Sequence, residues 1–275
     1  MINALTVDVE EWFHICGVPG LGPARWNDLP SRVEPTTERL LELFARVGAR
    51  ATFFVLGWIA ERHPRLVDEI RGAGHEIGSH GHWHRRAYDL GEAGFIDDLR
   101  RSLRTLSAAG APAVTAYRAP EWSINRRSLW ALPVLAGHGI RLDASMAPVR
   151  MVGSPSFPRQ PHLHQTSGGP ILEVPPLVAD RFGQTIPLGW GWGLRMSTPG
   201  RVLEVIGRTN QAGSPAVLTI HPWEIDPNPP RVPLPTGLRF AHYFRLAGFA
   251  DRLRSILEGA SFGPLHEAVA HLQSR

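Results

Sequence analysis

Hydrophobic and polar positions along this chain follow two periods that alternate with one another. Short apolar runs typical of buried strands occur at six places, 4–14, 51–56, 115–118, 140–143, 171–174 and 216–220. Between most of these runs, apolar residues recur three and four positions apart, which predicts helices at 36–47, 64–72, 95–106, 128–135, 199–206 and 244–257. Strands and helices that alternate in this order predict an α/β protein with a parallel sheet.

The first predicted strand separates its apolar and acidic side chains. Successive side chains of a strand point to opposite faces, so Leu5, Val7 and Val9 would lie on one face and Asp8 and Glu10 on the other. Two carboxylates would then stand together at the end of the strand.

Other polar residues also follow predicted strands. Arg118, Asp143 and His221 each come at the end of one. Any one of them has an ordinary explanation, as a surface charge, a helix cap or a buried histidine. Ligands of parallel α/β proteins bind at the carboxyl ends of the strands, so the set as a whole predicts a site there.

The segment 75–84 carries a second signal, the pair His80 and His84 in an H-x3-H spacing. If this stretch begins a helix, the two imidazoles share one face and can bind a divalent metal with a third ligand from elsewhere. His82 would then face away. Gly81 follows His80 where a zinc protease motif has Glu, so the base has to come from another segment, with Asp8 or Glu10 as the natural source.

Composition excludes several classes of protein. The chain has 275 residues, 43% of them hydrophobic, and a formal net charge of only +4. No run of five or more basic residues occurs, so nucleic-acid binding is not expected. Cys16 is the one cysteine, which excludes an internal disulfide, fits a reducing compartment and favours a cytoplasmic location. We see neither a signal-peptide pattern nor an apolar run of about 18 residues, and so expect no membrane insertion.

We expect a single domain over 1–275 with two less regular parts. The Pro/Gly-rich stretch 148–199 is too long for a plain loop, and is expected to be an irregular insertion with short strands. A helical extension is expected at 238–275. The insertion contains GWGWG, in which glycines flank Trp190 and Trp192. Glycine gives a mobile backbone, so we predict that this loop is a lid that lines the substrate cleft.

Five short motifs in order resemble those of the polysaccharide deacetylase family, which has the NodB-homology fold and is carbohydrate esterase family 4. TVDVE resembles T-F-D-D, SHGHWH resembles H-[ST]-x-x-H, RAPEW resembles R-x-P-x-W, LDAS resembles D-S-S and LTIHPWE resembles L-x-H. The segments DVEEWFH, HPWE and HYFRL further resemble the branch associated with exosortase and exopolysaccharide loci. The resemblance spans nearly the whole chain.

The resemblance implies a distorted (β/α) barrel with one divalent metal ion. Matched motif by motif, the implied roles are Asp8 as catalytic base, His80 and His84 as metal ligands, Arg118 as the residue that orients the base, His221 as general acid, Asp143 as the carboxylate that tunes it, and Trp122 as a wall of the acyl pocket.

Gly81 replaces the Ser or Thr of H-[ST]-x-x-H, and two further departures from the family pattern matter most. The family's metal-binding Asp is replaced by Val9, and strand alternation offers Glu10 in its place, with Glu11 as the alternative that points the other way. The D-S-S motif has become Asp143-Ala144-Ser145 and has lost one hydroxyl.

The resemblance implies a hydrolase that removes an N-acetyl group from an amino sugar or a glycan that contains one. A backbone N–H near Glu121 would help to hold the oxyanion. Zinc is the expected metal, although two histidines and a carboxylate also suit iron, cobalt or manganese. The alternatives are a deformylase or other hydrolase of non-peptide amides, or an inactive glycan-binding protein. The inactive protein is disfavoured because the residues with implied roles in catalysis and metal binding are intact, namely Asp8, His80, His84, Arg118 and His221. The sequence gives no oligomeric state.

Overall fold

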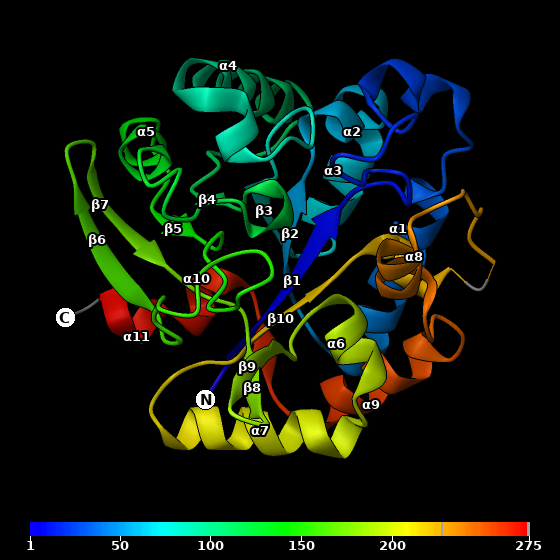
Figure 1. The fold of residues 1–275 in the computed structure, drawn as a ribbon, viewed down its shortest axis with the longest axis vertical. Coiled ribbons are helices and arrows are strands. Elements are labelled where there is room, and N and C mark those ends of the chain that lie inside the picture. Colours follow the sequence, from blue (N-terminus) through cyan, green and yellow to red (C-terminus); the bar gives the residue numbers. More distant parts are fainter. Residues whose placement is uncertain (227, 274–275) are drawn as a thin grey trace.

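A computed structural model of the chain describes residues 1–226 and 228–273, and its centre is a curled parallel sheet (Figure 1). In this part of the chain the sheet has nine strands, in the order β10-β1-β2-β3-β4-β5-β7-β6, with β11 paired to the start of β1. The strands are β1 Asn3–Val9, β2 Thr52–Val55, β3 Glu76–Ser79, β4 Ala116–Tyr117, β5 Leu142–Asp143, β6 His162–Thr166, β7 Gly169–Glu173, β10 Val217–Ile220 and β11 Phe262–Gly263. Only the β6–β7 pair is antiparallel among these described strands. The predicted distorted barrel of the NodB-homology type is confirmed as a half-barrel.

Helices surround the sheet on its outside (Figure 1). They are α1 Val33–Val47, α2 Gly57–Arg62, α3 Pro64–Gly72, α4 Ala87–Ala108, α5 Ala131–Gly137, α6 Gly191–Met196, α7 Pro199–Gln211, α8 Thr236–Tyr243, α9 Phe249–Gly259, α10 Leu265–Ala268 and α11 Ala270–Gln273. The described residues also form three 3-10 turns, which are η1 Pro23–Asp28, η2 Pro120–Trp122 and η3 Pro222–Ile225. Among the described helices, none combines the length and the apolar character needed to cross a membrane.

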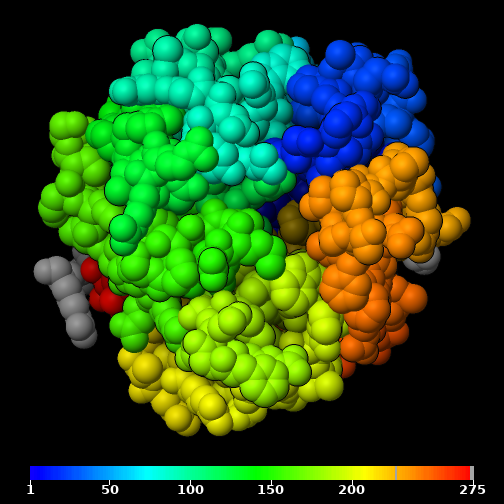
Figure 2. All heavy atoms as spheres, in the orientation of Figure 1, coloured from blue at the N-terminus to red at the C-terminus, as the bar shows by residue number. Residues whose placement is uncertain are grey.

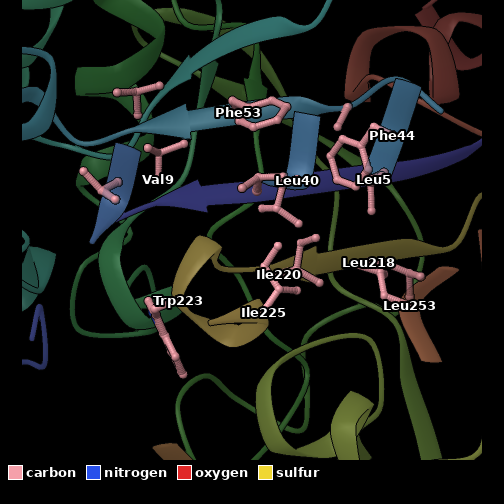
Figure 3. Close-up of a cluster of buried hydrophobic side chains, with 14 of the residues drawn as sticks. Leu5, Val9, Leu40, Phe44, Phe53, Leu218, Ile220, Trp223, Ile225 and Leu253 are labelled. Atoms are coloured by element: carbon pink, nitrogen blue, oxygen red, sulfur yellow. The ribbon is translucent and has the colours of Figure 1, made fainter. Parts of the chain in front are cut away.

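The largest hydrophobic cluster lies between the sheet and the helices that cover it on one side (Figure 3). Strands β1, β2 and β10 contribute alternate side chains, and α1, η3 and α9 pack onto them. The side chains labelled in Figure 3 are Leu5, Val9, Leu40, Phe44, Phe53, Leu218, Ile220, Trp223, Ile225 and Leu253. Burial of each such side chain contributes about 1.5–3 kcal/mol, so this cluster fixes the position of β1.

The predicted insertion 148–199 contains regular elements. The hairpin β6–β7 extends the main sheet, and a separate hairpin joins β8 Val178–Arg181 to β9 Gln184–Pro187. Thr198 caps α7 as expected, because its side chain accepts a hydrogen bond from the backbone N–H of Arg201 at 3.3 Å.

Several predicted helix boundaries differ from the structure: the helix predicted at 95–106 spans Ala87–Ala108, and the one predicted at 199–206 continues to Gln211. Helix α1 begins at Val33 rather than 36, and α5 begins at Ala131 rather than 128. The helix predicted at 244–257 starts only at Phe249, as α9, after Gly248, whose φ of +70° is left-handed, and a separate helix, α8, ends before it at Tyr243. Glycine adopts that conformation at no steric cost, so the chain turns here between two helices.

Candidate active site

The polar residues singled out from the sequence gather at the carboxyl ends of adjacent strands. Asp8 and Glu10 lie at the end of β1, His80 follows β3, and His221 follows β10, which is paired to β1. Figure 2 shows a hollow near the middle of this face, above the tip of β1 as drawn in Figure 1. Atoms coloured as the blue, green and orange parts of the chain border it, so segments far apart in the sequence form its rim.

Glu10, His80 and His84 form a compact buried group. The Glu10 Oε2 atom lies 2.5 Å from Nε2 of His84 and 3.6 Å from Nε2 of His80. One ligand atom from each residue lies within 4.8 Å of the others. Two imidazole nitrogens and one carboxylate oxygen at this spacing fit a divalent metal, and form a common zinc donor set.

Glu11, the alternative third ligand, points away from this group. Its carboxylate accepts hydrogen bonds from the backbone N–H groups of Arg32 at 2.9 Å and Val33 at 3.3 Å, at the start of α1. The side chain of Ser31 donates to it as well. Glu11 thus satisfies the first N–H groups of α1, which explains why this helix begins earlier than its sequence pattern indicates.

The H-x3-H pair is brought together by a loop, and the helix expected there is wrong. Gly81 has a φ of +72° and His84 a φ of +46°, and α4 starts only at Ala87. The Asp98 carboxylate of α4 holds this loop by accepting the backbone N–H groups of His82 at 2.7 Å and Trp83 at 3.0 Å. A Cβ atom on residue 81 would lie 2.8 Å from Asp98 Oδ2, so the loop requires the glycine that replaces the family's Ser or Thr.

The imidazoles of His80 and His84 are each held through the ring nitrogen that does not face Glu10. Nδ1 of His80 lies 2.8 Å from the carbonyl oxygen of Arg118, which can only accept, so this nitrogen carries the hydrogen. Nδ1 of His84 lies 3.5 Å from Sγ of Cys16. In both rings Nε2 is left to face Glu10, which is the orientation that a metal ligand needs.

The charges in the group are complementary. Burial by itself raises the pKa of Glu10, but the charge of His84 and the contacts with the His80 and His84 rings outweigh it and hold this pKa well below its usual range. Burial lowers the pKa of His84, and Glu10 and Cys16 more than compensate and raise it well above the usual range. A carboxylate kept ionised in a buried position is ready to bind a cation.

His82 lies outside the group. Its Nε2 is 3.4 Å from Glu61 Oε2, and its ring packs edge-on against Trp83 at 4.7 Å. Burial, followed by the charge of Arg101, lowers its pKa to about 4. The ring is therefore neutral and structural, and faces away from Glu10 as expected.

Asp8 is paired with a buried arginine. Nη1 of Arg118 donates to Asp8 Oδ1 and to Thr6 Oγ1, both at 2.8 Å, and Nε donates to the carbonyl of Ala144 at 3.0 Å. Both partners of the ion pair are almost fully buried. These fixed contacts orient the Asp8 carboxylate, so the structure brings together the two residues predicted as base and orienting arginine.

His221 faces both acidic residues of β1. Its Nε2 lies 3.9 Å from Asp8 Oδ2 and 3.7 Å from Glu10 Oε1. The ring is 12% exposed, more than Asp8 or Glu10, so it borders the opening. Burial lowers the pKa of His221, and Glu224, Glu10 and Asp8 outweigh burial and raise it to about 9. A ring protonated at neutral pH is suited to donate a proton.

The carboxylate that contacts the His221 ring belongs to Glu224, and the prediction that Asp143 would do so is wrong. Nδ1 of His221 lies 3.0 Å from Glu224 Oε2. Asp143 instead accepts a hydrogen bond from Ser145 Oγ at 2.5 Å and pairs with Glu173 on β7. The H-x-x-E spacing of HPWE was visible in the sequence, and the 3-10 turn η3 brings its two ends together.

The RAPEW segment forms a strained turn beside Arg118. Glu121 and Trp122 both have left-handed φ values, +54° and +50°. Such conformations cost about 1–3 kcal/mol each and persist where packing or function holds them. The Glu121 side chain accepts hydrogen bonds from Arg86 Nε at 2.7 Å and Cys16 N at 3.2 Å. The oxyanion contact at its backbone N–H and the acyl pocket at Trp122 stay predictions.

The GWGWG segment is not the mobile loop expected from its glycines. Trp190 is buried, its ring lies 4.8 Å from that of Trp122, and it pairs with Thr219 in an isolated bridge. Gly191 starts α6, which contains Trp192 as a partly exposed residue. Cβ atoms on Gly189 and Gly193 would lie 2.6 and 2.2 Å from backbone oxygens. The glycines therefore allow close packing, and the lid interpretation is wrong for Trp190.

Family models match two adjacent parts of the chain. A model described as polysaccharide deacetylase matches residues 25–140, and a model described as a domain of unknown function, DUF3473, matches residues 144–270. The first range contains His80, His84 and Arg118, and the second contains His221 and Glu224. The candidate site is therefore built from both ranges and from β1 before them.

Known proteins resemble the chain in sequence and in fold. A peptidoglycan deacetylase of Helicobacter pylori is 31% identical over 108 residues, which is 39% of this chain and 36% of that protein. The chain thus matches little more than a third of this relative's length. A Mycobacterium smegmatis structure assigned as a polysaccharide deacetylase superposes with a TM-score of 0.63 at 21% identity, over 98% of this chain and 89% of the other.

The structure of an allantoinase superposes with a TM-score of 0.59 at 16% identity, over 98% of this chain and 89% of the other. This likeness concerns the fold. The family model over residues 25–140, the deacetylase relative and the half-barrel with its strand-end site agree with one another, and together they support a polysaccharide deacetylase.

Proposed function

We propose that this protein is a metal-dependent hydrolase that removes the N-acetyl group from an amino sugar or from a glycan that contains one. The observation that carries the proposal is one buried arrangement. The Glu10–His80–His84 group stands beside the Asp8–Arg118 pair, and Nε2 of His221 lies within 4 Å of both carboxylates.

Glu10 and the Nε2 atoms of His80 and His84 would hold the metal, with zinc as the proposed ion. When bound, a divalent metal supplies Lewis-acid polarisation of a carbonyl and lowers the pKa of a water. The donor atoms fit that ion because both imidazoles already have Nε2 aimed at the carboxylate.

The other roles belong to residues of this chain. Asp8, oriented by Arg118, takes a proton from the attacking water at its carboxylate. His221 gives the proton on Nε2 to the nitrogen of the leaving amine when the C–N bond breaks. Water thus adds its hydroxyl to the acyl carbon, and the products are acetate and a free amino sugar.

The proposed substrate is an N-acetylated glycan. This choice is supported by the Helicobacter pylori relative, which is named a peptidoglycan deacetylase. We extend the proposal to exopolysaccharide assembly on the basis of the DVEEWFH, HPWE and HYFRL segments. The polymer length and the physiological acyl group are part of the test, because N-formyl sugars would fit the same group of residues.

Metal content and acetate release from N-acetylglucosamine oligomers test the proposal. Wild type should bind about one equivalent of metal, and His80→Ala and Glu10→Ala should lose it. His82→Ala is the matched control in the same loop and should retain it. Asp8→Asn should retain metal and fold but lose about 10²-fold or more in kcat, the usual range for a general base.

Three results would contradict the proposal. Unchanged metal content in Glu10→Ala would remove Glu10 from the ligand group. Near-normal turnover by Asp8→Asn would move the base to another residue. Wild-type protein that releases formate from N-formyl sugars but no acetate would replace deacetylation with deformylation.

A further inference from the structure

A buried arginine from the second half of the chain lies behind His221. Nη1 of Arg195, in α6, lies 3.3 Å from Oε1 of Glu224, and both side chains have no exposed surface. Neither residue belongs to the metal group or to the Asp8–Arg118 pair. The two oxygens of Glu224 are thus divided, with Oε1 toward Arg195 and Oε2 toward His221.

Glu224 contacts His221 at two points, the backbone nitrogen and the ring. Its Oε2 atom accepts a hydrogen bond from the backbone N–H of His221 at 3.0 Å. The same oxygen lies 3.0 Å from Nδ1 of the His221 ring. This double contact fixes the ring relative to its own backbone. It holds the hydrogen on Nδ1 and turns Nε2 toward Asp8 and Glu10.

Arg195 is itself held by helix α8. Its guanidinium donates to the carbonyl oxygens of Ala241 and of His242, the latter at 3.1 Å. The His242 ring stacks on Trp223 at 4.1 Å, and Nε1 of Trp223 lies 3.4 Å from Glu10 Oε1. Helices α6 and α8 therefore form a wall that contacts the acid through Glu224 and the metal carboxylate through Trp223.

The charge of Arg195 gives this arrangement a physical reason. Burial raises the pKa of Glu224, but the charge of Arg195 and the contacts with His221 outweigh burial and lower it. A protonated Glu224 would accept poorly from the imidazole, and a buried carboxylate without a counter-charge is strongly disfavoured. Arg195 thus keeps Glu224 able to hold the ring.

We propose that Arg195 and Glu224 are positioning residues for His221, which fix Nε2 in the direction of the leaving nitrogen. This inference rests on the proposed amide hydrolysis. In that reaction the C–N bond breaks, its electron pair stays on nitrogen, and the nitrogen takes the proton from Nε2. The proton from water is held on Asp8, and exchange with solvent restores both groups. The hydrogen on Nδ1 of His221 stays on that nitrogen throughout, in its contact with Glu224.

Two substrates separate positioning of the acid from general damage. An N-acetylglucosamine oligomer has a poor leaving amine that needs a proton. Hydrolysis of 4-nitrophenyl acetate instead releases 4-nitrophenolate, a stable anion that leaves without a proton. Glu224→Gln and Arg195→Met should lower kcat for the oligomer by about 10–100-fold, within the contribution of a general acid, with KM changed by less than about 3-fold. The rate with the aryl ester should change by less than about 3-fold.

Further variants test whether Arg195 acts through Glu224. Arg195→Lys keeps the charge and should recover most of the oligomer activity. The double variant Arg195→Met, Glu224→Gln should be no slower than Glu224→Gln, because residues acting through one contact are not additive. Arg201→Met and Glu204→Gln are matched controls, since this pair on α7 has a 2.7 Å contact but is 44% exposed at both ends, and both should leave turnover unchanged.

A spectroscopic readout does not depend on activity. With ¹⁵N-labelled histidine, and His221→Asn to assign the signals, the Nδ1 hydrogen of His221 should give a downfield resonance that is weakened or shifted in Glu224→Gln and preserved in Arg195→Lys. Should Arg195→Met fail to fold, the near-isosteric Glu224→Gln decides the question.

The outcomes separate the two proposals. Equal losses on oligomer and ester, or no loss on the oligomer, would overturn the positioning role. An unchanged His221 resonance in Glu224→Gln would do the same. Wild type that hydrolyses the ester but no N-acetylated sugar would overturn the proposed function, and the resonance would still decide whether Glu224 and Arg195 position His221.

Discussion

Replacement of Glu173 with glutamine should stabilise this protein at pH 8. Asp143 on β5 and Glu173 on β7 are paired in register, and neither side chain is exposed. Each has one further partner, Ser145 Oγ at 2.5 Å from Asp143 and the Met146 backbone N–H at 2.9 Å from Glu173. Two carboxyl groups this close in a buried place share a proton easily, but both ionise only at a cost.

The magnitude follows from the shifted pKa values. Burial raises the pKa of Asp143 to about 6 from an ordinary value of 3.8, even though hydrogen bonds from its neighbours lower it. A shift of roughly 2 units corresponds to about 3 kcal/mol between the two protonation states. Burial and then the negative charge of Asp143 raise the pKa of Glu173 well above 4.5.

The sign of the effect is set by proton binding. With raised pKa values the folded protein holds more protons than the unfolded chain, so the free energy of unfolding falls as pH rises. For Asp143 the fall starts near its unfolded value of 3.8 and extends through about 6, and Glu173 continues it to higher pH. In Glu173→Gln one ionisable group is gone, and the amide can donate to the Asp143 carboxylate. We expect a gain of about 1–3 kcal/mol at pH 8 and a flatter pH profile.

The assay is urea unfolding of wild type and Glu173→Gln at several pH values from 5 to 8.5. A gain of 1 kcal/mol should raise the melting temperature by about 2–4 °C in a protein of this size. Glu38→Gln, at an exposed position of α1, is the control and should follow wild type at every pH. A variant less stable than wild type at pH 8, or with an equally steep profile, would refute the interpretation of this pair as a destabilising shared-proton site.

Two further predictions concern packing and capping. Trp190→Ala should lower the free energy of unfolding by about 3–5 kcal/mol, as expected for a buried aromatic side chain. Trp192→Ala should lower it clearly less, because Trp192 is partly exposed. Equal losses in urea unfolding would contradict the core position of Trp190. Thr198→Ala should lower the free energy of unfolding by about 0.5–2 kcal/mol through loss of the α7 cap, with the exposed Arg201→Ala as a comparison, and an unchanged urea midpoint would show that this cap contributes nothing.

Local patterns in the sequence indicated much of the candidate site. A parallel sheet puts the ends of its strands at one edge, so Asp8, His80, Arg118 and His221 could be expected together before any coordinates were known. The choice of Glu10 over Val9 also followed from the alternation of side chains in β1. These predictions depended on periodicity and strand order, which short segments carry by themselves.

Other features required the three-dimensional arrangement. No local pattern indicated that Asp98 on α4 would hold the histidine loop, because that contact joins residues 15 and 16 positions apart across a turn. The glycines around Trp190 suggested motion, yet backbone oxygens of neighbouring segments occupy the space that side chains would fill. Glycine looks the same in a mobile loop and in a tightly packed one.

The contacts of His221 show most clearly what the sequence indicates and what only the tertiary structure decides. The motif resemblance identified the histidine, and tertiary packing decided which carboxylate it contacts. Asp143 is occupied by Glu173 from the neighbouring strand, while the turn η3 folds Glu224 back onto Nδ1. Arg195 reaches Glu224 from 29 positions away in the chain, because α6 packs against α8 and the end of β10. Local sequence carries backbone conformation and burial pattern, whereas the pairing of buried charges depends on which distant segments fill the same space.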